Sequence, residues 1–68
     1  MKQKINTKKE YTFKLFPTKT KSYTRSHWCD NDNEAFNQLW GMMYAMFFEH
    51  KHPRAELWRD GKCIHSVR

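Results

Sequence analysis

Apolar and polar side chains alternate along the first third of the chain, with the period of two that is typical of β-strands. Residues 11–16, YTFKLF, place Tyr11, Phe13 and Leu15 on one face, which predicts a half-buried strand. Residues 22–29, SYTRSHWC, repeat the alternation after a short connection. Because short connections join antiparallel neighbours, we expect the two segments to form a hairpin.

The middle of the chain changes to the apolar spacing of a helix. This helix is expected to run from about Asp32 to about His50, and Pro53 excludes a much longer one. Asn31 is the expected N-cap, with Glu34 three positions later to complete a capping box. One broad apolar face is expected to cover the sheet: Phe36, Leu39, Trp40, Met43, Met46 and Phe47.

The last segment, residues 55–67, predicts a second hairpin. Its central Asp-Gly pair is a strong signal for a type I′ turn, because both turn residues must adopt a positive φ. In the register that this turn sets, Leu57 faces Ile64, and His65 shares the opposite face with Trp58.

These elements predict an α+β fold with the order β-β-α-β-β, in which one helix packs on a small antiparallel sheet to give two layers. Residues 10–68 are expected to form this single domain, and the charged residues 1–9 to form a flexible basic N-terminal tail. A chain of 68 residues buries only about 60% of its unfolded surface. Chains of this size often gain stability from a disulfide, a metal or a partner subunit.

The predicted helix carries more apolar side chains than one face can hold. Met42, Tyr44 and Phe48 fall outside the core-facing side, and Gly41 and Ala45 lie roughly opposite it, four residues apart. A glycine inside a helix costs about 1 kcal/mol relative to alanine. In one interpretation, Gly41 is a tolerated neutral substitution, and a loop or the tail covers the surplus aromatic residues. In the other, the back of the helix contacts another protein. In the second interpretation Gly41, Ala45 and Phe48 form a groove for a second copy of the chain or for a target.

The net charge of +6 is concentrated near the start of the chain, where residues 1–25 hold only one acidic side chain, Glu10. This asymmetry favours a polyanion or an acidic protein surface as partner. The uncharged run 39–48 is too short to span a membrane, and no apolar segment follows the first lysines, so neither a membrane span nor a signal peptide is expected. We therefore expect a cytoplasmic location with reduced thiols.

Two hairpins supply the expected partner-binding residues. The first interleaves cations with aromatics, including Tyr11 and Phe13, and the second offers Trp58, a residue type enriched at interface hot spots. The full candidate set is Lys14, Lys19, Lys21, Tyr23, Arg25, Trp58 and His65. Because cations neutralise phosphates and aromatic faces stack on bases, nucleic acid is the alternative partner, although no established nucleic-acid motif is present.

Metal binding and catalysis receive little support from the sequence. His27, Cys29, Cys63 and His65 have the residue types of a tetrahedral zinc site, but the usual C-x₂-C spacing is absent, and we interpret them as ordinary surface histidines and semi-buried thiols. The chain has two glycines and no glycine-rich phosphate loop. We expect a non-enzymatic protein without a cofactor.

The small size, the lysine-rich start, the capped aromatic helix NDNEAFNQLWGMMYAMFF and the closing hairpin AELWRDGKCIHSV together resemble the small accessory proteins of tailed bacteriophages. That group includes host-takeover and anti-defence factors that bind one host protein and block it. The resemblance covers residues 11–68 and carries over no functional residue. It implies an inhibitor that acts by binding a host protein in the bacterial cytoplasm.

Overall fold

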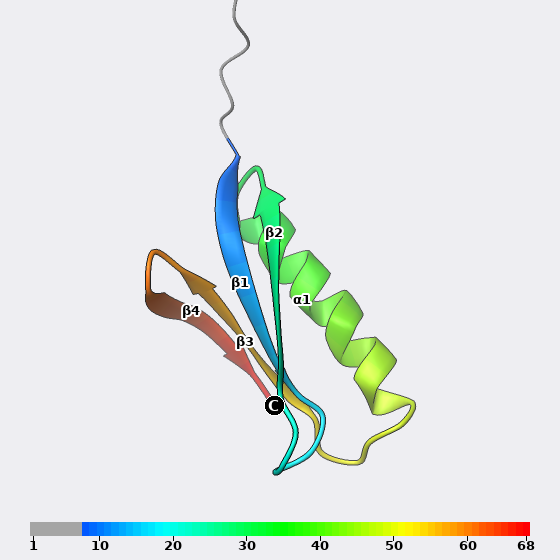
Figure 1. Cartoon of the computed structure of the whole chain (residues 1–68). Helices are drawn as coiled ribbons and strands as arrows, with labels where there is room; N and C mark the ends of the chain where they lie inside the picture. Colours follow the sequence, from blue (N-terminus) through cyan, green and yellow to red (C-terminus); the bar gives the residue numbers. More distant parts are fainter. Residues whose placement is uncertain (1–7) are drawn as a thin grey trace, which may run out of the picture.

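One antiparallel sheet with one helix on one of its faces makes up the fold (Figure 1). The computed structural model describes residues 8–68, so residues 1–7 of the expected tail lie outside the described part. The elements follow the predicted order β-β-α-β-β, which confirms the α+β fold. They are β1 (Lys9–Phe16), β2 (Tyr23–Cys29), α1 (Asp32–Phe47), β3 (Arg54–Arg59) and β4 (Lys62–Val67).

Strand β1 lies inside the sheet, whose strand order is β2-β1-β3-β4. It pairs with β2 and β3, so that Phe13 lies opposite Arg25 on one side and Leu57 on the other. The predicted alternation along this strand is confirmed, because Tyr11, Phe13 and Leu15 are all buried beneath the helix. The strand begins at Lys9, one residue before the expected domain boundary.

The core is narrower than the predicted apolar face of the helix. Three helical residues at four-residue spacing are buried, Ala35, Leu39 and Met43. Of the expected core positions, Phe47 is exposed, because the C-terminal end of α1 diverges from the sheet (Figure 1). The hydrophobic core consists of Tyr11, Phe13, Leu15, Cys29, Ala35, Leu39, Met43, Ala55, Leu57 and Val67.

Local hydrogen bonds fix the start of α1 as predicted. The Asn31 side-chain oxygen accepts from the backbone N–H of Glu34 at 2.8 Å, and the Glu34 carboxylate accepts from the backbone N–H of Asp30 at 2.9 Å. Both bonds satisfy donors at a helix start that lack partners within the helix. The helix ends at Phe47, three residues earlier than expected, so His50 lies beyond its last turn.

The turn between β3 and β4 has the predicted geometry. Asp60 and Gly61 adopt φ values of 54° and 76°, the positive pair that a type I′ turn requires. Next to the turn, Trp58 lies opposite Cys63, as expected.

Farther from the turn than the Trp58–Cys63 pair, the predicted register of the second hairpin is wrong. A β-bulge at Ile64 places His65, and not Ile64, opposite Leu57. Because one extra residue reverses the alternation along a strand, His65 points to the helix side of the sheet and does not share a face with Trp58. Its ring centroid lies 4.5 Å from that of Phe36.

Candidate partner-binding surfaces

A groove of about 290 Å³ lies between the C-terminal half of α1 and the start of β2. It opens because the helix packs mainly on β3 and β1, which leaves the edge strand β2 uncovered along most of its length. Its lining residues are Leu15, Pro17, Tyr23, Arg25, Met42, Ala45, Met46, Glu49 and His50.

This α1–β2 groove combines an apolar floor with a polar rim. Met42 and Met46 supply flexible thioether side chains, which adapt to the shape of a bound group. Arg25 and Tyr23, two expected partner-binding residues, lie on the side of β2, and Ala45, an expected self-association residue, lies on the side of the helix. The structure thus brings together residues that the sequence assigned to two separate surfaces.

The back of α1 adjoins this groove and remains apolar and open. Phe48 is 90% exposed and Tyr44 is 64% exposed. No atom lies within 4 Å of the position that a Cβ on Gly41 would occupy, beyond the helix's own backbone and the chain neighbours. No segment within residues 8–68 buries these side chains, so the described chain does not supply the covering loop of the first interpretation.

The sheet face turned away from α1 carries aromatic rings paired with cations. Lys14 Nζ lies 3.9 Å from the centroid of the Trp58 ring, and the Arg54 guanidinium lies 4.5 Å from that of Phe16. The indole N–H of Trp58 donates a hydrogen bond of 3.0 Å to the Glu56 carboxylate. This outer face therefore unites Lys14 and Trp58, two of the expected partner-binding residues.

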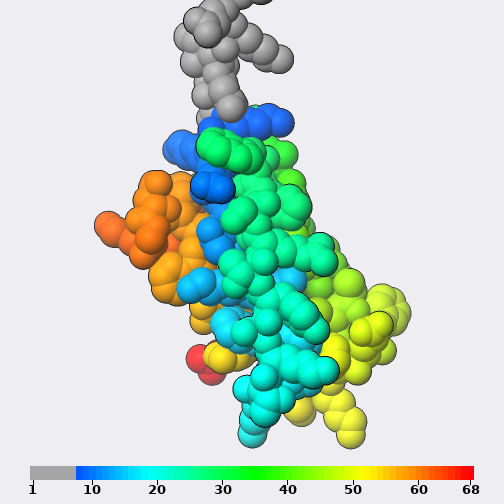
Figure 2. Space-filling view, in the orientation of Figure 1, coloured from blue at the N-terminus to red at the C-terminus, as the bar shows by residue number. Residues whose placement is uncertain are grey.

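Cations from three separate segments gather at one end of the molecule. Figure 2 shows the β1–β2 connection (cyan), the α1–β3 connection (yellow) and the C-terminal residue (red) toward its lower end. Two shallow hollows join these segments, one shared by Lys19, His52 and Arg54 and the other by Lys51, Arg54 and Arg68. We call these five residues the basic end.

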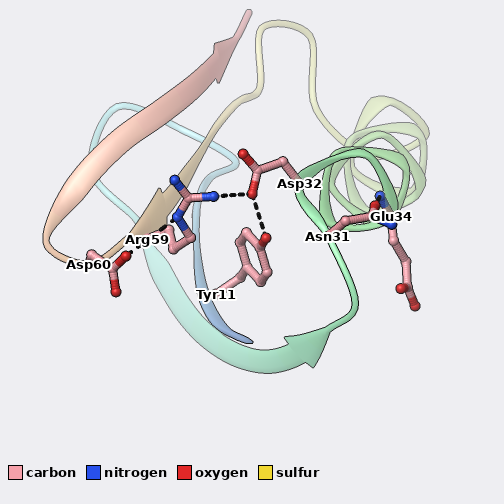
Figure 3. Close-up of polar contacts among 6 residues, drawn as sticks. All are labelled: Tyr11, Asn31, Asp32, Glu34, Arg59 and Asp60. Atoms are coloured by element: carbon pink, nitrogen blue, oxygen red, sulfur yellow. Dashed lines mark hydrogen bonds and ion pairs between the residues drawn. The ribbon is translucent and has the colours of Figure 1, made fainter. Parts of the chain in front are cut away.

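A polar cluster that the sequence did not reveal lies at the opposite end of α1 (Figure 3). The Tyr11 hydroxyl donates to Asp32 Oδ1 at 2.5 Å, and Arg59 Nη1 donates to the same oxygen. The two hydrogen bonds, first that from Tyr11, hold the pKa of Asp32 below its ordinary value. Burial and the neighbouring carboxylate raise the pKa of Tyr11. The sequence did not reveal this cluster because its members lie far apart in the chain, on β1, α1 and β3, and form no local motif.

The expected partner-binding set does not form one surface. Lys14 and Trp58 lie on the outer face, Tyr23 and Arg25 line the groove, and His65 packs beside the helix. Lys19 belongs to the basic end, and Lys21 follows it in the same connection. The aromatic rings of Tyr11 and Phe13 are fully buried, so they cannot stack on a ligand as the nucleic-acid interpretation assumed.

The four residues considered for zinc are also dispersed. His27 and Cys29 lie on β2, and Cys63 and His65 lie on β4, at the opposite edge of the sheet. Across residues 8–68, no three His, Cys, Asp or Glu side chains cluster in a way that could hold a metal ion. The bulge at Ile64 further separates Cys63 and His65, because it directs them to different faces.

No protein-family model matches the chain, and neither a curated protein nor a solved structure matches it. In the part of the chain that the structure describes, no helix has the length and apolar character needed to cross a membrane.

Proposed function

We propose that the protein is a non-enzymatic inhibitor that blocks a partner protein by covering its surface. The observation that carries the proposal is the α1–β2 groove and the exposed back of α1 beside it, with Phe48 90% exposed. Contiguous apolar surface of this kind is rarely left open on a monomer unless it binds something. An apolar side chain of the partner would fill the groove. In return, the exposed Phe48 would insert into the surface of the partner.

The charge around the groove favours an acidic partner surface. Arg25 lines the rim, and Lys21 lies in the connection that leads into β2. Against them stands one acidic residue of the lining, Glu49. The net charge of +6 acts in the same direction and would speed the encounter with an acidic protein.

The resemblance to phage accessory proteins supports a bacterial host protein as the target. An inhibitor of that class needs no catalytic group, because occupation of the target's working surface is enough to block it. The proposed site of action is then the bacterial cytoplasm.

A pair of matched variants tests the groove. Ala45→Arg places a cation at the groove, and Ser26→Arg places the same cation on the outer face of β2. Each tagged protein is used to capture partners from a bacterial lysate, and the captured protein is then purified and titrated by calorimetry. We expect one dominant protein bound 1:1 by the wild type and by Ser26→Arg, with binding lost in Ala45→Arg. Equal binding by both variants would contradict the assignment of the groove.

A second copy of the chain is the other occupant considered for the back of α1, through Gly41, Ala45 and Phe48. Light scattering separates the two arrangements. A dimer that Phe48→Ala converts to a monomer would assign this surface to self-association, whereas a wild-type monomer that binds the captured protein supports the inhibitor.

A further inference from the structure

No described element covers the outer face of the sheet, the face turned away from α1 (Figure 1). Register places three aromatic residues on it, Phe16, Trp28 and Trp58, one from each of three neighbouring strands. Trp28 is 56% exposed. Aromatic faces that emerge from a sheet can stack on unpaired bases, an interaction that tolerates any sequence because every base has a π face.

Cations contact two of these three rings, whereas Trp28 lies opposite Glu10 on the neighbouring strand β1. Lys14 lies over the Trp58 ring and Arg54 over the Phe16 ring. A base that stacks on Trp58 would displace the flexible Lys14 side chain, which can then reach the adjoining phosphate. The Trp58 indole is held in place meanwhile by its hydrogen bond to Glu56.

The basic end adjoins the outer face and adds further contacts for the phosphate backbone of a bound strand. Phe16 and Arg54, at one margin of the outer face, share a hollow with Lys19 and His52. Lys51 and Arg68 follow in the next hollow, which also contains Arg54. A strand that leaves the aromatic rings therefore meets successive cations from three segments of the chain, and each phosphate contact releases a counterion and strengthens binding.

Hydroxyl groups occupy much of the remaining outer face. Thr24, Ser26 and Ser66 are exposed there, and Thr12 lies between Ser26 and Trp58. Serine and threonine hydroxyls both donate and accept, which suits the ribose 2′-hydroxyl that distinguishes RNA from DNA.

We propose that the outer face and the basic end together bind single-stranded RNA, with Trp28 and Trp58 as stacking platforms and Lys19, Lys51, Arg54 and Arg68 as phosphate contacts. This site lies on the side of the sheet opposite the α1–β2 groove, so it does not depend on the proposed inhibitor function.

Fluorescence anisotropy with a labelled twelve-nucleotide oligouridine measures RNA binding by the full-length chain and tests the stacking platform. Trp28→Ala is expected to weaken binding roughly 5- to 150-fold. The matched control is Tyr44→Ala, which removes a similarly exposed aromatic ring from the back of α1 and should leave binding unchanged. Ser26→Glu, a second variant that keeps Trp28, should also weaken binding, because it places an anion on the outer face beside the bound RNA strand. Equal effects of Trp28→Ala and Tyr44→Ala would overturn the proposal.

The salt dependence of binding tests the basic end. Lys19→Ala should reduce the slope of log K against log salt by about 0.7, the contribution of one phosphate on a single strand. Lys62→Ala, at the turn between β3 and β4, is the matched control and should leave the slope unchanged. If the slope fell by the same amount in both variants, RNA would be attracted by the net charge of the whole protein, and the assignment of the basic end as the phosphate-binding site would be overturned.

Two further ligands test the identity of the partner. Oligodeoxyuridine of the same length differs only in the sugar, and duplex RNA offers phosphates without open base faces. We expect both to bind more weakly than oligouridine. Equal affinity for the deoxy ligand would overturn the assignment to RNA, and equal affinity for the duplex would overturn the stacking mode.

Discussion

The hydroxyl of Tyr11 donates a hydrogen bond to Asp32, although the two residues lie 21 positions apart in the chain. Arg59 donates to the same carboxylate oxygen, so one acidic side chain in the first turn of α1 joins two strands of the sheet (Figure 3). The position also suits a carboxylate, because the N-terminus of a helix carries partial positive charge. This cluster fixes how the start of the helix sits on the sheet.

Removal of the Tyr11 hydroxyl should lower stability without disturbing the core. Tyr11→Phe keeps the buried ring but deletes the hydrogen bond to Asp32, at a cost of about 1 kcal/mol. Urea denaturation measures the difference. Tyr44→Phe, which removes a hydroxyl from an exposed ring, is the control and should change the free energy of unfolding by less than about 0.5 kcal/mol.

The lowered pKa of Asp32 predicts a loss of stability in acid. In the folded protein the pKa lies below the value of about 3.9 for an unfolded chain, so the unfolded state takes up this proton first as the pH falls. The stabilisation is therefore complete above about pH 5 and disappears as the pH falls below about 4 and through the folded-state pKa. Denaturation from pH 3 to pH 7 should show Asp32→Asn less stable at neutral pH, with the gap closing in acid. A gap that does not change with pH would contradict this assignment.

Gly41 should be replaceable by alanine with a gain in stability. The site is exposed, and the added Cβ meets open space, so Gly41→Ala should stabilise the helix by about 0.8–1 kcal/mol. The reverse change nearby, Ala45→Gly, should destabilise it by a similar amount. Thermal unfolding measures both, with about 4–8 °C expected per kcal/mol for a domain of this size. A lower melting temperature for Gly41→Ala would show that something packs closely against the glycine.

The two thiols should differ strongly in reactivity. Cys63 is exposed, whereas Cys29 is buried and its pKa is raised by that burial, so little reactive thiolate forms. Labelling with iodoacetamide, followed by mass spectrometry, should modify Cys63 about 100-fold faster under native conditions, given a stability of about 3 kcal/mol. The Cys63→Ser variant isolates Cys29, which should react readily only in urea. Rapid native labelling of this variant would contradict the burial of Cys29.

Features set by neighbouring residues were predictable from the sequence. The alternation of Tyr11, Phe13 and Leu15, the cap at Asn31 and the Asp60–Gly61 turn each depend on a few consecutive residues, and all three are confirmed. The fold class followed from their order.

Features set by long-range packing were not predictable. No local signal marks the bulge at Ile64, which moved His65 to the helix side, and none pairs Asp32 with partners 21 and 27 positions away. The α1–β2 groove exists because of where the helix settles on the sheet, which the apolar pattern of α1 does not specify. The expected binding residues were therefore divided among surfaces that the sequence could not separate.

The bulge in β4 also bears on self-assembly. A regular edge strand is a template for another strand, and a bulge twists such an edge away from pairing. The described sheet has a regular edge at β2 and an irregular one at β4. If two copies joined through β2, each would present only its interrupted strand outward, so growth would stop at a closed dimer and not extend into a fibril.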